Sequence, residues 1–174
     1  MSVEFISTWG QVTPELQAEL ADLWARHNAL KDPSIAAERA RQAVCIARNG
    51  EGELVGVGTA FIKVLPRLRQ PMYYYRQFFA PDFRGQAQAV PFLNHARQIL
   101  QAHNAALASP ESLGVLLELE NAKLATHYDQ AYVAVGNSTF IGYSPRGLQL
   151  RVSYFEGARL LAPAPLRRRP APLR

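Results

Sequence analysis

The segment from Phe78 to Ala89 constrains the fold of this chain more than any other part of the sequence. Its aromatic first residues are typical of a β-strand, the small residues around Gly85 are typical of a tight turn, and the residues from Ala89 onward have the apolar spacing of a helix. A strand that passes through a tight turn into a helix leaves backbone N–H groups unpaired beside the positive end of the helix dipole. The segment therefore predicts a loop that binds an anion, and phosphate is the usual ligand of such a loop.

The remaining sequence predicts one α/β domain in which strands and helices alternate. Thr13-Pro14 and Asp32-Pro33 each combine a capping residue with a proline suited to a first helical turn. Helices are expected at 14–29, 33–42, 89–103 and 121–129. Strand candidates are 3–8, 43–48, 54–64, 72–79, 113–119, 132–135, 139–143 and 148–155. The turn at 49–52 should join its two flanking strands as an antiparallel hairpin.

Length and composition favour a soluble globular protein. The 174 residues suit a single domain, and 48% hydrophobic with 19% charged residues is the usual balance for a packed core with a solvated surface. No apolar run approaches the ~20 residues that cross a membrane, and the first residues lack the pattern of a signal peptide. The single cysteine, Cys45, excludes an internal disulfide and is expected to be buried in an apolar strand. These features predict a cytoplasmic location.

The positive charge of the chain is concentrated at its end. The net charge is +5, and Arg167, Arg168, Arg169 and Arg174 supply most of it. Because four prolines accompany these arginines, the expectation is a domain over 1–161 and a flexible tail over 162–174. A solvated tail is the favoured interpretation. The alternative, an arm that binds nucleic acid, predicts salt-sensitive binding that is lost when the tail is removed.

Two motifs resemble a known family. The spacing Arg84-x-x-Ala87-x-Ala89 resembles the Arg/Gln-x-x-Gly-x-Gly/Ala pyrophosphate loop of the GNAT superfamily of acyl-CoA N-acyltransferases, with Ala87 where that family has glycine. The segment from Asn121 to Tyr128 is similar to the family's Asn-containing helical segment after strand five. The resemblance covers about residues 3 to 155. It implies an α/β (α+β) fold with a mixed, mostly antiparallel twisted sheet of six to seven strands and about four helices.

The resemblance also implies where acyl-CoA would bind. Backbone N–H groups around Phe78 to Ala80 would polarise the thioester carbonyl and hold the pantetheine arm, and the loop would take the pyrophosphate. Ala87 carries a Cβ that crowds a phosphate and disfavours a positive φ. The implied CoA-binding residues are Phe78, Phe79, Ala80, Arg84, Gly85, Gln86, Ala87, Gln88, Ala89 and Asn121.

Candidate catalytic residues follow from the same match. Tyr128 stands where the family has a tyrosine that gives a proton to the departing CoA thiolate, and a position at the edge of the core is its alternative reading. The expected fourth strand contains no carboxylate to act as general base. Glu118 and Glu120 share one face of the next strand and are the candidates for this role, but both also fit a solvated strand face.

The resulting functional hypothesis is a CoA-dependent N-acyltransferase that uses acetyl-CoA and a primary amine. The alternative is a non-catalytic protein of the same fold that senses an acyl-CoA or binds a partner, favoured by the missing carboxylate and by Ala87. The four histidines have no ligand-like spacing, so no metal is expected. The sequence lacks the motifs of serine hydrolases, P-loop NTPases and Rossmann dehydrogenases. No membrane partner is expected, and a homodimer is a possible assembly.

Overall fold

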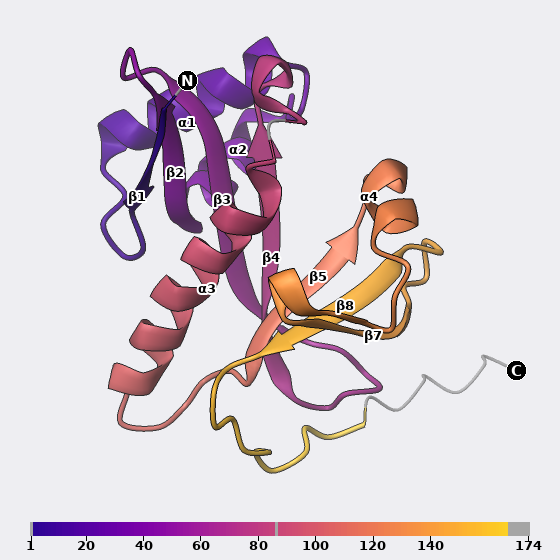
Figure 1. The fold of residues 1–174 in the computed structure, drawn as a ribbon. Coiled ribbons are helices and arrows are strands. Elements are labelled where there is room, and N and C mark those ends of the chain that lie inside the picture. Colours follow the sequence, from indigo (N-terminus) through magenta and orange to yellow (C-terminus); the bar gives the residue numbers. More distant parts are fainter. Residues whose placement is uncertain (1, 86, 167–174) are drawn as a thin grey trace, which may run out of the picture.

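Over residues 2–85 and 87–166, which the computed structural model describes, one twisted sheet of eight strands forms the frame of the domain (Figure 1). The order across the sheet is β1-β2-β3-β4-β5-β8-β7-β6, and among these strands only β4 and β5 pair in parallel. The strands are β1 Val3–Ser7, β2 Ala43–Asn49, β3 Leu54–Val64, β4 Pro71–Phe79, β5 Gly114–Leu119, β6 Tyr132–Val133, β7 Ser138–Tyr143 and β8 Gln149–Tyr154. The mixed, mostly antiparallel sheet is confirmed. The strand count exceeds the expected six to seven because the two-residue β6 also pairs.

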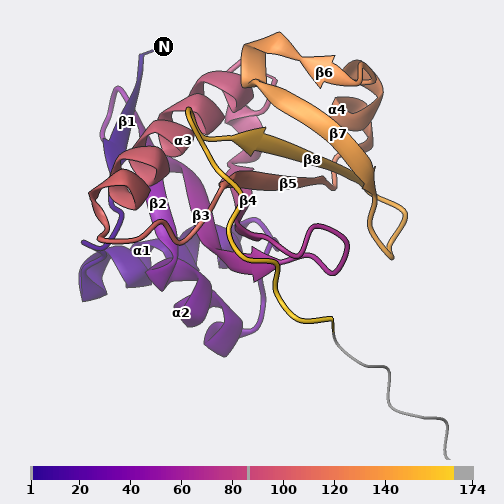
Figure 2. The ribbon, with the colours of Figure 1, turned by 90° about the horizontal axis from the view of Figure 1, so that it is seen from below.

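Helices cover both faces of the sheet in its first half. Over the same described residues the α-helices are α1 Pro14–Arg26, α2 Pro33–Arg41, α3 Ala89–Ala106 and α4 Ala122–His127, with 3-10 turns η1 Pro81–Phe83 and η2 Ala134–Gly136. Helix α3 lies on one face, and α1 and α2 lie on the other (Figure 2). None of these helices is long and apolar enough to cross a membrane.

The helix starts follow the capping pattern, and some ends differ from the expected ones. The Thr13 side chain accepts a hydrogen bond from Leu16 N at 3.1 Å, and Asp32 accepts from Ser34 N at 2.9 Å. Helix α1 stops before the expected residue 29 because Asn28 takes a left-handed conformation with φ of 51°. The segment expected as a strand at 132–135 is a two-residue strand followed by η2.

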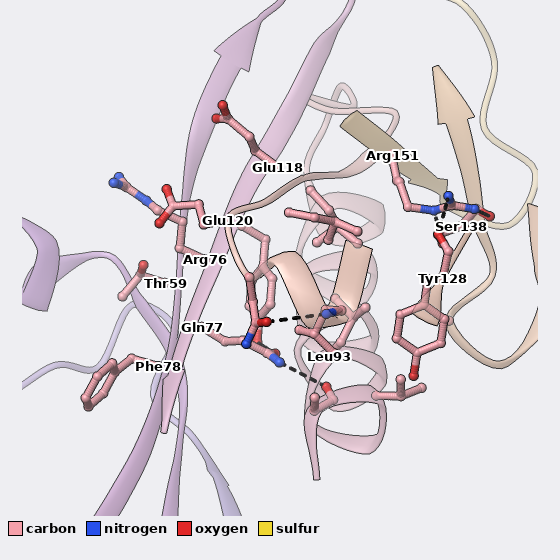
Figure 3. A pocket seen from close by; sticks show the side chains of 18 of the residues that line it. Thr59, Arg76, Gln77, Phe78, Leu93, Glu118, Glu120, Tyr128, Ser138 and Arg151 are labelled. Carbon is pink, nitrogen blue, oxygen red and sulfur yellow. Dashed lines mark hydrogen bonds between the residues drawn. The ribbon is translucent and has the colours of Figure 1, made fainter. Parts of the chain in front are cut away.

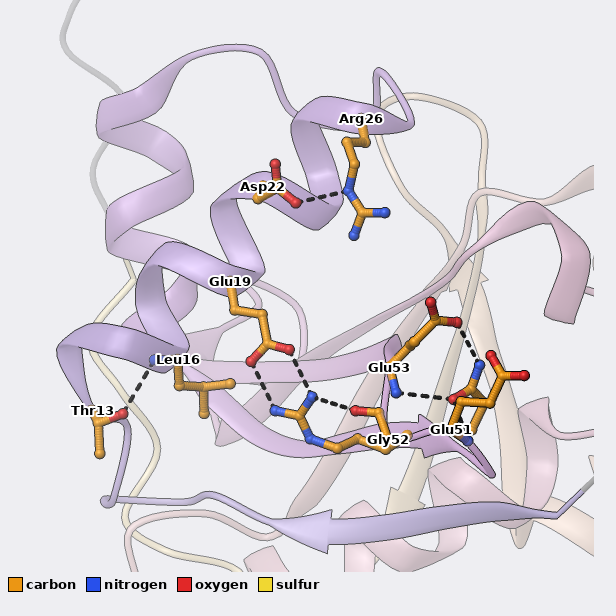
Figure 4. Close-up of polar contacts among 10 residues, drawn as sticks. Thr13, Leu16, Glu19, Asp22, Arg26, Glu51, Gly52 and Glu53 are labelled. Atoms are coloured by element: carbon orange, nitrogen blue, oxygen red, sulfur yellow. Dashed lines mark hydrogen bonds and ion pairs between the residues drawn. The ribbon is translucent and has the colours of Figure 1, made fainter.

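Polar contacts join α1 to β2 and close the hairpin between β2 and β3 (Figure 4). Arg48 of β2 forms a two-pronged ion pair with Glu19 of α1, with N–O distances of 2.6 and 2.8 Å. In the expected hairpin turn, the Asn49 side chain accepts from the backbone N–H of Glu51 and Glu53. The predicted antiparallel pairing of β2 with β3 is confirmed.

The hydrophobic core lies between the sheet and its helices. Leu20 and Leu23 of α1 and Phe92 and Leu100 of α3 are at most 1% exposed. Cys45 is fully buried in β2, as its apolar neighbours predict, and burial raises the pKa of its thiol to about 12. The core fixes both helix layers against the same strands, so it also fixes where the α3 N-terminus meets β4.

The two central parallel strands separate partway along their length. Strand β4 pairs with β5 from Tyr73 with Val115 to Tyr75 with Leu117, and the printed register goes no further. Beyond that point β4 continues along β3, and β5 continues along β8. Figure 1 shows β5 turning away from β4. This separation opens the sheet near the start of α3.

The described start of the expected tail packs on the connection between β3 and β4. Gln70 exchanges two hydrogen bonds of 2.9 Å with the backbone of Leu161. Ala164 donates to Arg69 O at 2.9 Å and accepts from Arg69 Nε at 2.7 Å. Of these contacts, those of Ala164 lie beyond the expected boundary at residue 161. The arginines at 167–174 lie outside the described residues.

Candidate active site

A cavity of about 410 Å³ occupies the opening between β4 and β5. The ends of these strands line it together with the first turn of α3, helix α4 and side chains from α1, α2, β3 and β8. Seven of the expected site residues contribute to its wall: Phe78, Arg84, Ala89, Glu118, Glu120, Asn121 and Tyr128. Figure 3 shows that this wall has two sides, with Arg76 and Thr59 on one side of β4 and Gln77 and Leu93 on the other.

The backbone of β4 presents alternate peptide groups to the opening. Tyr73 N donates to Ser112 Oγ on the β5 side at 3.1 Å, whereas Ala80 N donates to Val55 O of β3 at 2.8 Å. Peptide groups alternate in direction along a strand. The N–H groups of Gln77 and Phe79 therefore face the opening, and those of Phe78 and Ala80 face β3. Of residues 78–80, which were expected to polarise a thioester, Phe79 is the one whose N–H faces the opening. The N–H of Gln77, just before this range, has the same orientation.

The loop before α3 is built from left-handed residues. Gly85 has φ of 80° and Ala87 has φ of 56°, and for a residue with a Cβ this conformation costs roughly 1–2 kcal/mol. The side chain of Gln88 does not cap α3, whose first hydrogen bond runs from Phe92 N to Gln88 O at 3.0 Å. As noted from the sequence, a Cβ at position 87 disfavours a positive φ, and Ala87 does adopt a positive φ. Gln86 lies outside the described residues.

Side chains of β4 hold this loop and the start of α3 in place. Gln77 Nε2 donates to Ala89 O at 3.2 Å, and Tyr75 Oη donates to Gln77 Oε1 at 3.0 Å (Figure 3). Arg84 Nε donates to Phe79 O at 3.0 Å while its guanidinium lies 5.2 Å from the Phe78 ring centre. The Phe79 ring itself packs in the core. The loop expected to bind an anion is thus attached to β4 through these side chains.

Gly58 of β3 leaves the space that Tyr75 occupies. A Cβ on this glycine would lie 2.5 Å from Tyr75 Oη. Tyr75 is 3% exposed, so its ring cannot move into solvent without disturbing the core. The absence of a side chain at Gly58 therefore allows the hydrogen bonds from Tyr75 through Gln77 to the start of α3.

Tyr128 ends helix α4, and a buried arginine fixes the backbone that follows it. Its N–H donates to Leu124 O at 2.9 Å, and its carbonyl accepts from Arg151 Nη1 at 3.4 Å. Arg151 is 2% exposed and also donates to Gln130 O at 2.7 Å and Ser138 Oγ at 3.0 Å. Burial lowers the pKa of Arg151, and its hydrogen bonds to oxygen atoms offset the cost of burying the charge. Figure 3 places the Tyr128 side chain on the side of the cavity where Leu93 lies.

Asn121 has a local structural task at the start of α4. Its side chain accepts from Lys123 N at 2.9 Å and from Leu124 N at 3.3 Å, which is the geometry of an N-cap. Helix α4 is therefore shorter than the expected 121–129, because Asn121 is its N-cap and the helix ends at His127. The role of Asn121 in CoA binding stays a prediction.

The two candidate bases differ in their surroundings. Glu118 is 7% exposed at the side chain, accepts from Tyr74 Oη at 2.7 Å and pairs with Arg146 at 3.1 Å. Burial acts to raise its pKa, but hydrogen bonds from Ser144, Arg146 and Tyr74 outweigh burial and lower the pKa to about 2. Glu120 pairs with the same Arg146 at 2.9 Å and is 60% exposed, just past the end of β5. Glu118 is therefore a weak base at neutral pH, whereas Glu120 is free to exchange partners.

Comparisons with solved structures identify this arrangement of strands and helices. A phosphinothricin acetyltransferase from Sinorhizobium meliloti in complex with AcCoA has 12% sequence identity, a TM-score of 0.62, and 94% coverage of each chain. A GNAT-family acetyltransferase from Streptococcus pneumoniae has 12% identity and a TM-score of 0.59, with 88% of this chain and 100% of that one covered. The chain has the GNAT fold.

A third similar structure is that of an oligomeric acetyltransferase. The dodecameric spermidine N-acetyltransferase from Vibrio cholerae has 13% identity and a TM-score of 0.53, and the match covers 88% of this chain and 92% of that one. No protein-family model matches the sequence, and no curated protein sequence does. The similarity to GNAT structures therefore rests on the three-dimensional arrangement. At sequence identities this low, the similarity establishes the fold alone.

Three side chains that organise this cavity were not predicted from the sequence. Tyr75, Gln77 and Arg151 organise the cavity wall, but each looks like an ordinary strand residue in the sequence. One signal was present: Gly56 and Gly58 alternate on β3, which indicates large side chains on the neighbouring strand. Arg151 had no comparable signal, since its partners are mainly backbone carbonyls. Among the described residues no group of His, Cys, Asp or Glu forms a metal site.

Proposed function

We propose that this protein is a CoA-dependent N-acyltransferase that moves an acyl group, acetyl in the simplest case, from acyl-CoA to a primary amine. The observation that carries the proposal is the cavity between β4 and β5, whose wall contains both ends of the loop before α3 (Arg84 and Ala89), the free edge of β4 and Tyr128. A neighbour of the same fold was solved in complex with AcCoA, which supports the choice of co-substrate.

In this proposal acyl-CoA binds along the free edge of β4. The pantetheine arm meets the N–H groups that face the opening, and the pyrophosphate meets the loop from Arg84 to Ala89 beside the N-terminus of α3. The full set of proposed CoA-binding residues stays Phe78, Phe79, Ala80, Arg84, Gly85, Gln86, Ala87, Gln88, Ala89 and Asn121. The attachment of the loop to β4 through Gln77 then sets the distance between pyrophosphate and thioester.

The chemistry needs a polarised carbonyl, a neutral amine and a proton for the leaving thiolate. The N–H of Gln77 or Phe79 polarises the thioester carbonyl as the amine nitrogen attacks its carbon. When the C–S bond breaks, Tyr128 gives its proton to the CoA thiolate, whose pKa near 8.5 requires only a weak acid. The amine proton leaves to a base. We assign this role to Glu120, directly or through water, in preference to Glu118, whose pKa is about 2.

The competing function is a GNAT-fold protein that binds an acyl-CoA or a partner without catalysis. Two observations favour it: Glu118 is committed to Tyr74 and Arg146, and Ala87 holds a strained conformation in the loop. Both functions predict binding of a CoA ester. They differ in turnover.

Thermal melting and turnover separate these functions. Acetyl-CoA at 100 times its dissociation constant should stabilise the protein by roughly 2.7 kcal/mol, which a melting curve detects. CoA release is then followed against a panel of primary amines. Tyr128→Phe should lower kcat by about 100-fold with little change in acetyl-CoA affinity, because it removes a proton donor and keeps the ring.

Tyr143→Phe is the matched control, since Tyr143 is 68% exposed and far along β7. Stabilisation by acetyl-CoA without turnover of any amine would favour the non-catalytic function. The absence of stabilisation by any CoA ester would overturn both functions.

Location and assembly belong to the same proposal. We place the protein in the cytoplasm, where acetyl-CoA is available, with no membrane or nucleic-acid partner. A homodimer is the assembly to test, and the dodecameric neighbour is an example of assembly in this fold. Sedimentation velocity with and without acetyl-CoA tests the oligomeric state.

A further inference from the structure

Four arginines line the cavity, and two of them have a buried Nε atom without a hydrogen-bond partner among the described residues. Arg39 reaches it from α2 and Arg76 from β4. The Nε atoms of both side chains are buried and have no hydrogen-bond partner among the described residues. No carboxylate of residues 2–85 or 87–166 forms an ion pair with either guanidinium. Buried polar groups are normally satisfied, so two such donors in one cavity call for a ligand.

The surroundings of these two arginines do not neutralise their positive charge. The Arg76 guanidinium lies 5.2 Å from the Tyr74 ring centre and 5.4 Å from that of Phe61, which fixes its direction. Burial, and then the charge of Arg76, lower the pKa of Arg39, and Glu120 offsets this only in part. The Glu120 carboxylate is itself bonded to Arg146. The cavity therefore holds excess positive charge beside Arg39.

The arginines lie on the opposite side of β4 from the proposed CoA loop. Side chains alternate between the faces of a strand, so Arg76 and Phe78 share one face while Gln77 shares the face of α3. Figure 3 shows this division, with Arg76 and Thr59 together and Gln77 beside Leu93. An acyl donor held by the α3 loop would thus meet an acceptor that enters from the side of α2. The positive charge of Arg39 and Arg76 therefore lies on the side from which the acceptor would enter.

We propose that Arg39 and Arg76 bind a carboxylate on the acceptor, so that the acceptor amine is a small amino acid. This inference rests on the proposed acyltransfer function and names its substrate class. Guanidinium groups bind carboxylates through paired, charge-assisted hydrogen bonds. The cavity of about 410 Å³ must also hold the acyl group and the end of the pantetheine arm, which favours a small molecule. A phosphonate offers similar oxygen atoms and belongs in the test.

The first test compares amines that differ only in the carboxylate. Turnover is measured with phenylalanine and phenethylamine, with glutamate and 4-aminobutyrate, and with aminoethylphosphonate. The compound with an α-carboxylate should have a kcat/KM at least about 10-fold higher than its decarboxylated partner, from the loss of charge-assisted hydrogen bonds. Equal values for both members of each pair would overturn the proposal. A preference for the phosphonate alone would replace carboxylate by phosphonate as the recognised group, and would overturn the amino acid assignment.

The second test assigns the preference to the two arginines. Arg39→Gln and Arg76→Gln should each raise KM for the amino acid by about 10-fold or more and leave KM for acetyl-CoA unchanged, with partial rescue by lysine at either position. Arg41→Gln is the matched control, because Arg41 is exposed on the same helix. Melting curves of these variants should show no loss of stability, since a neutral side chain relieves the repulsion. Equal loss of activity toward amino acids and simple amines would overturn the assignment.

Calorimetry keeps this inference separate from the proposed function. If acetyl-CoA neither binds nor turns over, the acyltransferase function fails. Titration of the wild type and of Arg39→Gln with phenylalanine then reports on the anion site alone. Binding that the substitution abolishes would support the site, and no binding to the wild type would overturn it.

Discussion

The two halves of β4 have opposite characters although they belong to one strand. From Met72 to Tyr75 the side chains are no more than 6% exposed, and the strand pairs with β3 and β5 on its two edges. From Arg76 to Phe78 the side chains are half-buried and the β5 edge is open. The first half is specified by packing against its neighbours. The second half keeps polar and charged groups that packing alone would not select, which is the mark of a surface made for a ligand.

The change between these halves is caused by β5 rather than by β4. Beyond Leu117, β5 keeps its register with β8, where Glu118 faces Leu150 and Leu119 faces Gln149. Arg146, in the turn before β8, pairs with Glu118 and so holds β5 on that side. A parallel strand pair thus separates because one partner is bound more extensively to its other neighbour. Variants in either half should have different consequences, and four of them test this.

The largest effect is expected at Gly114, the first residue of β5, which pairs with Tyr154 of β8. A Cβ at this position would lie 2.2 Å from Ser153 O, a backbone atom of β8 that cannot move alone. Gly114→Ala should destabilise the protein by about 3 kcal/mol or more and lower Tm by roughly 10 °C. Gly50→Ala, where the nearest atom is 3.6 Å away, is the control and should change Tm little. A stable Gly114→Ala protein would show that β5 and β8 are not held this closely.

The next effect is a pH dependence that originates at the point of separation. The pKa of Glu118 is about 2 in the folded protein against 4.5 as the reference value. The carboxylate therefore stabilises the fold above about pH 5, and this contribution is lost as the pH falls toward 2. Its size is about 3 kcal/mol. Urea denaturation of the wild type and Glu118→Gln across this range measures it, and the two curves should converge at low pH.

Glu120→Gln is the control for this pH dependence, since Glu120 shares Arg146 but is 60% exposed. Its effect on stability should be below about 1 kcal/mol. Equal effects of the two substitutions would mean that the Glu118 contacts with Tyr74 and Arg146 do not separate β5 from β4.

A smaller effect is expected at the boundary, where Gly58 faces Tyr75. Gly58→Ala should displace the Tyr75 ring, destabilise the protein by about 1 to 2 kcal/mol and weaken acetyl-CoA binding through Gln77. The double variant Gly58→Ala with Tyr75→Phe removes the hydroxyl that lies 2.5 Å from the new Cβ, and should recover part of the stability. Additive losses in the double variant would contradict the steric explanation. Melting curves and acetyl-CoA titrations measure both effects.

The smallest effect on stability is expected at Ala87, in the loop that joins the open half of β4 to α3. Ala87→Gly relieves the left-handed conformation, but glycine also gains freedom in the unfolded chain, so the net change should stay within about 1 kcal/mol. Acetyl-CoA affinity should rise a few-fold because the loop no longer carries a Cβ near the phosphates. Ala87→Val should act in the opposite direction, since a β-branched residue is poorly suited to a positive φ. A titration that ranks valine above glycine would exclude this loop as the pyrophosphate site.

The sequence predicted the helices and the β2–β3 hairpin better than the separation of β4 from β5. Local signals such as Thr13-Pro14 and the hairpin turn at Asn49 place helices and strands, because they act over a few residues. The separation of β4 from β5 depends on β8, which lies about 30 residues further along the chain, so no local pattern contains it. The roles of Arg39, Arg76 and Arg151 were also out of reach. They depend on which charges remain without acidic partners after all others have paired.

The buried position of Cys45 has a practical consequence for every kinetic experiment described above. Each turnover of an acyl-CoA liberates one thiol, and disulfide reagents detect thiols in proportion to their thiolate content. The protein's single cysteine is fully buried with a pKa of about 12, so the folded protein should add almost no background to such an assay. The same reagent, applied without substrate, would label Cys45 only when β2 opens. One reaction mixture can therefore report catalysis and, in its blank, the rate of unfolding.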